Sequence, residues 1–180
     1  MQRIAVDMDG VLSDTVEQFI AWEYRENGIK RTIDELMGKP ELEVFPNSKK
    51  YLHTKDFFRT TSVIKDSQEI LERLNKKYQV FIVSAATEFP QSLTEKQAWL
   101  NEYFPFITWQ QMVFCGSKEI IQADIMIDDH FKNLNGFNGE LSILFTSRTM
   151  PMPTMDVIEG CIAGRRLVCC YCNWALGIGN

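Results

Sequence analysis

The sequence predicts an α/β fold: a Rossmann-like, three-layer core with a parallel sheet, and a helical cap inserted after the first strand. Two observations favour this class. Short apolar runs rich in β-branched residues alternate with segments whose apolar residues recur at helical spacing, which is typical of βαβ units. About seventy residues separate the first two apolar runs, far more than neighbouring elements need as a connection. The extra length predicts the cap.

The first predicted strand, residues 4–6, ends in a run of acids and glycine, Asp7-Met8-Asp9-Gly10. Such an ending is typical of a buried strand that meets a turn. Open α/β sheets bind ligands at the carboxyl ends of their strands, and side chains two apart on a strand point the same way. We therefore expect Asp7 and Asp9 to face one site. Two adjacent carboxylates suit a hard cation such as Mg²⁺, and a carboxylate is able to attack phosphorus.

The cap is predicted to span residues 15–75. Its apolar residues recur at helical spacing after Val16 and again after Ser67, while glycines and prolines interrupt the region between them. The aromatic candidates for contact with a substrate are Phe45, Phe57 and Phe58. Aromatic residues of this kind are more often part of a core, so both interpretations stay open.

The second half of the chain is predicted to alternate strands and helices, as a parallel sheet requires. The expected strands are residues 79–84, 112–115, 124–129 and 141–145, and the expected helices are residues 93–103 and 118–121. Residues 1–14 and 76–147 are thereby assigned to the α/β core.

Polar residues stand at or just after the ends of four predicted strands. They are Asp7 with Asp9, Ser84, Lys118, and Asp128 with Asp129. A parallel sheet brings these strand ends to one edge, although they are far apart in the sequence. Asp7 is then the candidate nucleophile, which forms an aspartyl-phosphate. Asp9 is expected to protonate the leaving oxygen and later to deprotonate the attacking water.

The other residues of this group have expected binding roles. The predicted Mg²⁺ ligands are Asp7, Asp9 through its backbone carbonyl, and Asp128. Asp129 is expected to be an orienting acid beside them. Ser84 and Lys118 are expected to bind phosphoryl oxygens, and the metal and Lys118 offset the negative charge that would otherwise repel a phosphorylated substrate.

Each position also has a structural alternative. Taken alone, Ser84 is a strand-end serine and Lys118 a solvated lysine, and the acid pair 128–129 could cap the helix expected near His130. An EF-hand calcium loop is disfavoured, since glycine stands at loop position four and Gln18 at position twelve. The chain has two histidines, which disfavours a histidine-based phosphatase mechanism and a zinc mechanism.

This arrangement resembles the haloacid dehalogenase-like phosphohydrolases. Their four signatures are an Asp-x-Asp strand end, a Ser or Thr strand end, a Lys and an acidic pair, and they occur here in that order. Within that superfamily the chain is most similar to the 5'(3')-deoxyribonucleotidases. The supporting motifs are residues 7–12 with Asp14, Phe57-Phe58, residues 96–100 and residues 127–129. The resemblance covers residues 3–147 and implies Mg²⁺-dependent removal of phosphate from deoxyribonucleoside monophosphates.

Three positions depart from the family pattern. Thr15 and Leu52 stand where aromatic residues are expected, and Gly116 stands where a basic residue often precedes the motif lysine. The departures leave base and sugar preference open. One alternative is a phosphatase for another small phosphorylated metabolite, and an alternative of another class is a non-catalytic nucleotide-binding or regulatory protein.

The composition limits which classes of partner and which cellular locations are expected. At 180 residues the chain is expected to form one domain with an insert, and its net charge of −5 argues against binding a nucleic-acid polymer through a basic surface. No apolar run approaches the ~18 residues of a membrane span, and the N-terminus has no secretory pattern. Five cysteines fit reduced thiols. We therefore predict a cytoplasmic protein with a small phosphomonoester as its partner; a homodimer stays open.

The C-terminal tail, residues 148–180, differs in character. It contains four of the five cysteines, but without a second pair or a histidine at the spacing of a zinc site. A one-base shift of the reading frame from Arg148 permits Pro-His-Asn followed by arginine-rich residues and tryptophan, similar to an ending common among the resembling family. We hypothesise that the tail is out of frame relative to its relatives, and a tail not selected to pack is expected to be poorly ordered.

Overall fold

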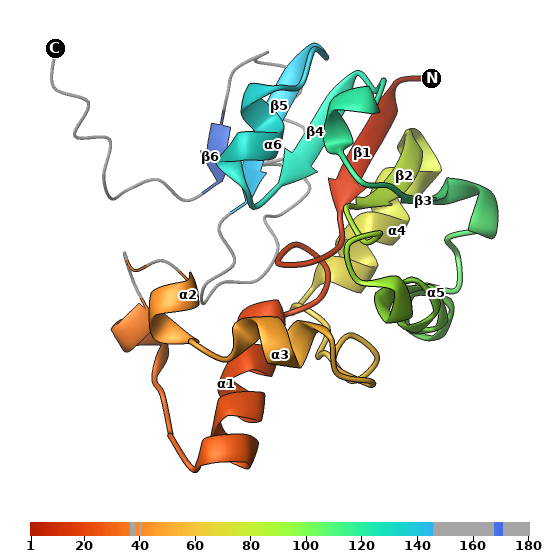
Figure 1. The fold of residues 1–180 in the computed structure, drawn as a ribbon. Helices are drawn as coiled ribbons and strands as arrows, with labels where there is room; N and C mark the ends of the chain where they lie inside the picture. The colour runs from red at the N-terminus through yellow and green to blue at the C-terminus, as the bar shows by residue number, and fades with distance from the viewer. Residues whose placement is uncertain (37–38, 40, 146–167, 171–180) are drawn as a thin grey trace, which may run out of the picture.

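Six strands form one sheet, and every neighbouring pair in it is parallel. The protein was studied as a computed structural model, which describes residues 1–36, 39, 41–145 and 168–170. The strands are β1 (Arg3–Asp7), β2 (Gln79–Ser84), β3 (Met112–Phe114), β4 (Ile125–Asp128), β5 (Leu141–Phe145) and β6 (Val168–Cys170). Their order across the sheet is β3-β2-β1-β4-β5-β6 (Figure 1).

The position of β1 between β2 and β4 decides where the site lies. Asp7 at the end of β1 pairs in register with Val83, one residue before the end of β2. On the other side Val6 pairs with Ile127, one residue before the end of β4. Because the three strands run in parallel, their last residues meet at one edge of the sheet. The predicted parallel α/β core is confirmed.

The helices fill the connections between these strands. The α-helices are α1 (Thr15–Asn27), α2 (Glu41–Val44), α3 (Ser48–Leu52), α4 (Ser67–Lys77), α5 (Pro90–Tyr103) and α6 (Phe131–Asn135). Short 3-10 turns are η1 (Ile33–Leu36), η2 (Trp109–Gln111) and η3 (Lys118–Ile120). Among the residues that the structure describes, no helix is both long and apolar enough to cross a membrane.

Helix α1 shows how local sequence sets an element's ends. The Asp14 carboxylate accepts a hydrogen bond from the Glu17 backbone N–H at 2.9 Å, which satisfies a donor that the first turn leaves free. The helix ends at Gly28, whose φ of 69° lies in the left-handed region that glycine adopts readily.

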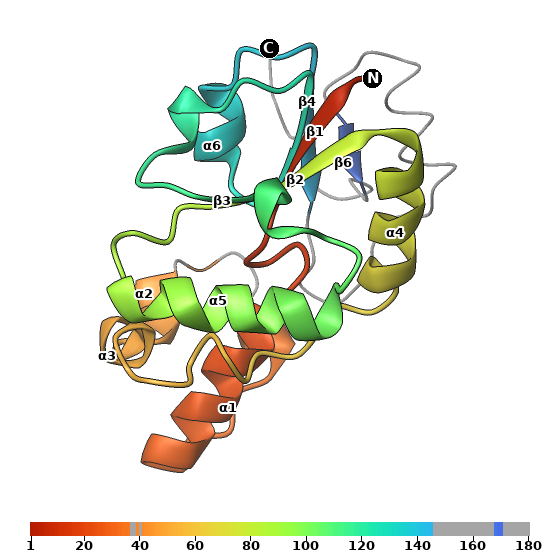
Figure 2. The ribbon, with the colours of Figure 1, turned by 90° about the vertical axis from the view of Figure 1, so that its right-hand side faces the viewer.

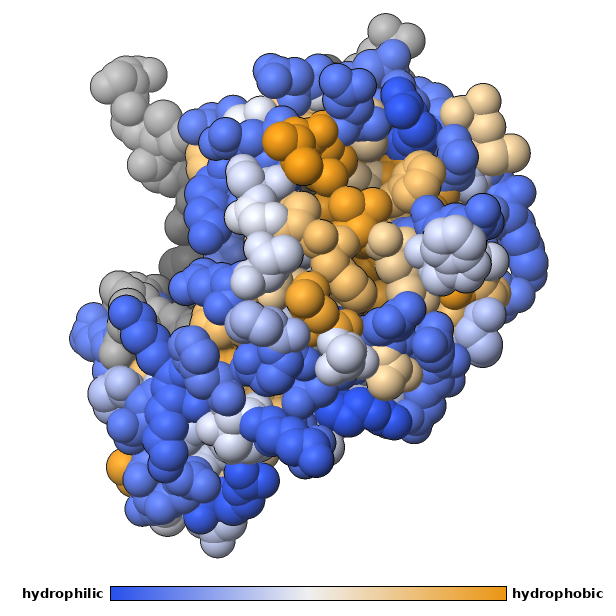
Figure 3. Space-filling view, turned by 45° about the vertical axis from the view of Figure 1, so that its right-hand side comes forward, coloured by the Kyte–Doolittle hydropathy of each residue, from blue (hydrophilic) through white to orange (hydrophobic). Residues whose placement is uncertain are grey.

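Apolar side chains cover both faces of the sheet and make the three layers. On one face, strand residues pack with Leu71 and Leu74 of α4 and with Trp99 of α5. On the other face, Ala5, Met126 and their neighbours pack with Leu134 of α6. Figure 2 shows α4 and α6 on opposite sides of the strands. The five-residue α6 covers its face incompletely, and Figure 3 shows apolar side chains at the surface on this side.

A second apolar cluster forms the cap. Its buried residues come from α1 to α3 and the loop that follows: Phe19, Trp22, Leu36, Val44, Phe45, Tyr51, Phe57 and Phe58. Figure 1 shows α1, α2 and α3 gathered beyond the carboxyl ends of the strands. Residues 67–75, which the sequence analysis placed in the cap, belong instead to α4 and pack on the sheet. We propose that the cap ends before Val63, which also packs with the sheet.

Within the C-terminal tail, residues 148–180, the structure describes one short segment. Residues 168–170 form β6 beside β5, with Val168 paired to Ile143. The remainder of the tail, to which the prediction of poor order applies, lies outside the described residues. The frame-shift hypothesis stays a prediction.

One side of α5 holds the loop that leaves the cap. The Glu95 carboxylate accepts hydrogen bonds from the backbone N–H groups of Asp56, Phe58 and Arg59 at 2.7, 3.1 and 3.2 Å. One turn further along, the Trp99 indole N–H donates to the Thr61 carbonyl at 2.7 Å. These bonds fix the loop that carries Phe58, so α5 determines where the cap meets the core.

The Glu95→Gln variant is expected to lose about 1–3 kcal/mol of unfolding free energy. Its amide NH₂ group must face backbone N–H donors that the carboxylate now satisfies, and a buried donor without an acceptor costs ~1–3 kcal/mol. Denaturant titration measures the change. The exposed Glu88→Gln is the matched control, expected to stay within about 0.5 kcal/mol of wild type. Equal stabilities of the two variants would contradict the proposed role of Glu95.

Candidate active site

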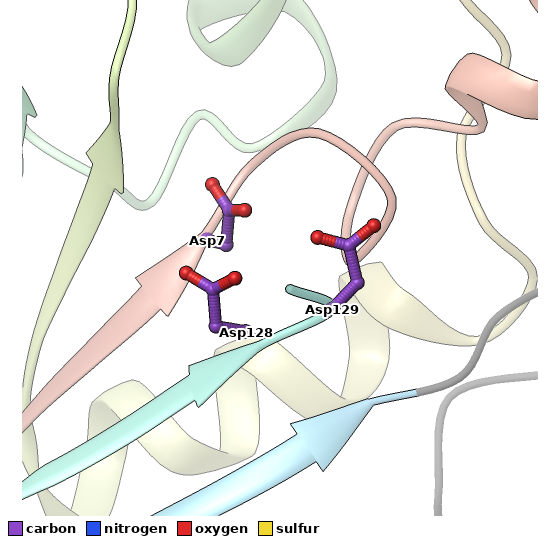
Figure 4. Close-up of side chains that lie close together, drawn as sticks. All are labelled: Asp7, Asp128 and Asp129. Carbon is purple, nitrogen blue, oxygen red and sulfur yellow. The ribbon is translucent and has the colours of Figure 1, made fainter. Parts of the chain in front are cut away.

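Three carboxylates converge where β1 and β4 end. Asp7 closes β1, Asp128 closes β4, and Asp129 follows directly. One oxygen of each lies within 4.8 Å of the other two, and Figure 4 shows the three groups around a shared space. Asp7 and Asp128 are buried, at 5% and 0% exposure. The pairing of β1 with β4 therefore brings together acids that lie more than a hundred residues apart in the sequence.

Lys118 lies between two of these acids. Its ammonium nitrogen is 2.6 Å from Asp7 Oδ1 and 2.6 Å from Asp128 Oδ2, and the side chain is buried. Burial alone would lower the pKa of Lys118, but the charges of Asp7 and Asp128 outweigh burial and raise it. Lys118 is therefore a permanent cation in the site.

One lysine does not balance the cluster. Burial raises the pKa of Asp7 well above its usual value, although Lys118 opposes this shift. Burial, followed by the charge of Asp128, raises the pKa of Asp129 to about 7. These shifts mean that the folded protein favours the neutral forms of Asp7 and Asp129, mainly because burial removes their charged forms from water.

Asp129 provides a further sign of a missing partner. Its Oδ1 atom is buried and has no hydrogen-bond partner among the described residues; the imidazole nitrogen His130 Nε2 is 3.9 Å away. Its Oδ2 atom lies against the turn after β1, where a Cβ on Gly10 would approach to 2.1 Å. Gly10 has a φ of 75°, so this turn needs glycine for its backbone and for its closeness to Asp129. An all-oxygen group with an unpaired oxygen fits a hard divalent cation.

Asp128 is held from several directions. Its carboxylate accepts the His130 backbone N–H at 2.8 Å and the Asn133 side-chain amide at 3.0 and 3.1 Å. The N-cap of the following helix α6 is His130, so Asp128 bonds to the residue at the helix start but does not itself cap the helix. The same bonds orient the carboxylate toward Asp7 and Lys118, as the supporting bonds of metal ligands do.

A second polar group lies beside the acids, at the end of β2. Ser84 Oγ is 3.2 Å from Asp9 Oδ2. Lys96 of α5 donates to the Asp9 carboxylate and, at 2.9 Å, to Ser84 Oγ. The structure therefore brings Ser84 to Asp9, as the sequence suggested, and adds a buried lysine to which the sequence analysis gave no role.

A pocket opens between the core and the cap. Its polar wall contains Asp9, Lys96, Asp129 and His130, and its apolar wall contains Phe19, Leu52, Phe58 and Phe89. Of the three aromatic candidates, Phe58 lines this pocket. Phe45 and Phe57 are buried in the cap and pack on Phe19, with ring centroids 5.3 and 4.9 Å away. The sequence analysis did not name Phe19 and Phe89 as candidates for contact with a substrate, although both line the pocket.

Two of the three departures from the family pattern, Thr15 and Leu52, also line the pocket. The third, Gly116, lies near Thr87: a Cβ added to it would be 3.1 Å from Thr87 Oγ1.

Comparisons with known proteins agree with this site. The family whose model matches residues 1–154 is described as "5' nucleotidase, deoxy (Pyrimidine), cytosolic type C protein". A 5'(3')-deoxyribonucleotidase of Bacillus subtilis (strain 168) is 43% identical over 145 residues, which cover 79% of this chain and 83% of that protein.

Solved structures agree on the fold. A haloacid dehalogenase-like hydrolase from Streptococcus pneumoniae has a TM-score of 0.50 at 12% identity, covering 89% of this chain and 90% of that one. A hydrolase from Streptococcus pneumoniae TIGR4 has a TM-score of 0.51 at 14% identity, with coverages of 91% and 98%.

The family model and the Bacillus subtilis relative identify the chain as a haloacid dehalogenase-like phosphohydrolase, and its parallel sheet agrees with the fold of the two solved structures. This confirms the superfamily that the motifs indicated. The family match is more specific, and the chain belongs to the cytosolic type C 5'-nucleotidase family of deoxyribonucleotidases. It is a phosphomonoester hydrolase of the 5'-nucleotidase type.

Proposed function

We propose that this protein hydrolyses deoxyribonucleoside monophosphates to a deoxyribonucleoside and inorganic phosphate, with Mg²⁺, through a phosphoaspartate on Asp7. The observation that carries the proposal is the cluster of Asp7, Asp128 and Lys118 beside an aromatic-walled pocket. The name of the Bacillus subtilis relative supports the choice of substrate.

Asp7 is the proposed nucleophile. The Met8 backbone N–H, at 2.7 Å, and Lys118 both engage Oδ1 of its carboxylate. Because both of these bonds are made to Oδ1, we assign the attack on phosphorus to the other oxygen, Oδ2. The two bonds also fix the plane of the carboxylate. The ester oxygen leaves as the new Oδ2–P bond forms, and water later cleaves that bond to release phosphate.

Asp9 is the proposed acid and base. It lies at the wall of the pocket, where the leaving ester oxygen and then the attacking water must stand. We assign it proton donation to that oxygen in the first half of the reaction and proton removal from the water in the second. Ser84, which lies beside Asp9, and Lys118, which lies beside Asp7, are assigned to the phosphoryl oxygens.

The metal is proposed to bind among Asp7, Asp128 and the backbone carbonyl of Asp9, with Asp129 beside it. The buried unpaired Oδ1 of Asp129 supports a direct or water-mediated contact with the ion. When bound, Mg²⁺ supplies positive charge that stabilises the charge developing on the phosphoryl oxygens. The residues themselves set its position through the bonds that orient Asp128.

Removal of the metal is expected to stop turnover. Phosphate release from deoxyribonucleoside monophosphates, ribonucleotides and sugar phosphates is measured with Mg²⁺, with excess chelator, and after Mg²⁺ is restored. We expect deoxyribonucleotides to be the best substrates, a loss of at least about 100-fold with chelator, and recovery on restoration.

Other results of this panel would point elsewhere. A preference for sugar phosphates would favour the phosphatase of another small metabolite. Binding of nucleotides without any turnover would favour the non-catalytic alternative. Full activity in chelator would overturn the metal assignment alone. The cytoplasmic location and the homodimer remain predictions of the sequence.

A further inference from the structure

The strongest unassigned feature of the site is the buried Lys96. Its side chain is 2% exposed, and its ammonium group donates to the Asp9 carboxylate and to Ser84 Oγ. The nitrogen also lies 4.4 Å from the centroid of the Phe58 ring. A lysine is almost never buried this far without partners, and these three groups are its partners.

Helix α5 places Lys96 rigidly. On one side of it, Ser92 Oγ donates to the Ala86 carbonyl in the turn after β2, at 3.0 Å. On the other side, the Trp99 indole is bonded to Thr61, at the end of the cap. Since both anchors lie within about one helical turn of Lys96, the lysine is fixed relative to both the core and the cap.

The Asp9 carboxylate is held at both of its oxygens. Lys96 and Ser84 engage Oδ2, while the Ser13 hydroxyl lies 3.4 Å from Oδ1. Asp9 stands on the turn after β1, outside the helices and strands, so these contacts from other elements are what orient its side chain. Lys96 makes the strongest of these contacts, because it alone carries a charge opposite to that of the carboxylate.

We propose that Lys96 is a positioning residue for Asp9: it holds the Asp9 side chain where the ester oxygen leaves, it pairs with the carboxylate once Asp9 has given its proton to that oxygen, and Phe58 of the cap shields this contact from water. The inference rests on the proposed function. It assigns Lys96 to Asp9 and not to the phosphoryl group, because two of its three N–H donors bond to Asp9 and Ser84 and its nitrogen lies over the Phe58 ring. The cap thereby contributes to the chemistry of the core through Phe58.

The test compares two leaving groups. An alkoxide, as in a deoxyribonucleoside 5'-monophosphate, needs a proton as it leaves, whereas p-nitrophenolate hardly does. We expect Lys96→Met to lower kcat/KM about 100-fold on the nucleotide and less than about 10-fold on p-nitrophenyl phosphate. Lys65→Met, which removes an exposed lysine, is expected to change neither value.

A double-mutant cycle separates action through Asp9 from an independent effect. In an Asp9→Asn background, Lys96→Met is expected to lower kcat/KM on the nucleotide by less than about 3-fold, because the group that it positions is already lost. Lys96→Gln repeats both measurements if Lys96→Met does not fold, since it keeps a polar group that can bond to Ser84.

The outcomes distinguish this inference from the proposed function. Equal losses on both esters, or a full additional loss in the Asp9→Asn background, would overturn the positioning role of Lys96. A wild-type enzyme that cleaves p-nitrophenyl phosphate but no deoxyribonucleotide would overturn the proposed substrate instead; the Lys96 comparison is then made between p-nitrophenyl phosphate and an alkyl phosphate that the enzyme cleaves.

Discussion

Asp7→Asn is expected to reduce phosphate release by a factor on the order of 10⁴ or more while leaving the protein folded. An amide oxygen is a poor nucleophile toward phosphorus, and removal of a covalent nucleophile has effects of this order in other hydrolases. The fold should survive, because asparagine has nearly the same shape. Burial already raises the pKa of Asp7, so a neutral side chain is not disfavoured at this position.

The measurement pairs phosphate release with thermal denaturation, and adds chemical trapping of an acyl-phosphate after rapid mixing with substrate. Asp66→Asn is the matched control: Asp66 is exposed, and its φ of 65° is one that asparagine also tolerates. The control is expected to retain full turnover and a trappable intermediate. Undiminished turnover in Asp7→Asn would remove the assignment of the nucleophile.

The residues at the strand ends were predictable because parallel-sheet geometry is strict. A run such as residues 4–6 ending in Asp7 predicts where the side chain goes, even with no knowledge of the rest of the chain. The same reasoning predicted the places of Ser84 and Asp128, and the structure brings all three to one edge. Their catalytic and binding roles remain proposals.

The contacts of the helices were not predictable in the same way. An apolar stripe indicates that α4 buries one face, but does not say whether the sheet or the cap covers it. Among the cap aromatics, Phe57 and Phe58 are adjacent in the sequence and both are buried in the cap cluster, yet of the two it is Phe58 that also lines the pocket. Their difference depends on how α5 holds the loop through Glu95, a contact between distant segments.

Lys96 did carry a signal in the sequence. Ser92, Lys96, Trp99 and Leu100 recur at helical spacing and share the buried side of α5. A lysine on such a stripe needs a partner in the interior, and acids at a strand end are the natural candidates. The partner itself, Asp9, depends on the docking of α5 against the core, which the periodicity does not give.

Lys118→Met is the second variant with a large expected effect, and it affects stability as well as turnover. It leaves the buried carboxylates of Asp7 and Asp128 without their cation, and breaking a buried charge pair in this way costs about 3–5 kcal/mol. Loss of the charge on the phosphoryl oxygens is expected to lower kcat by about 10²–10³-fold. Denaturant titration and phosphate release measure the two effects, and the exposed Lys132→Met is the control.

In the metal-free protein, the loss of unfolding free energy caused by Lys118→Met should depend on pH. The pKa of Asp129 is raised to about 7 in the folded state, against ~3.9 for an unfolded aspartate, so between these values the folded state binds more protons. The stability that Asp129 contributes is therefore lost as pH rises from ~4 to ~7.

Lys118 opposes the upward pKa shifts of Asp7 and Asp129, so its removal should make stability fall more steeply with pH. In excess chelator, we expect the destabilisation by Lys118→Met to be larger at pH 8 than at pH 5. A destabilisation that is independent of pH would mean that Lys118 contributes packing instead of charge.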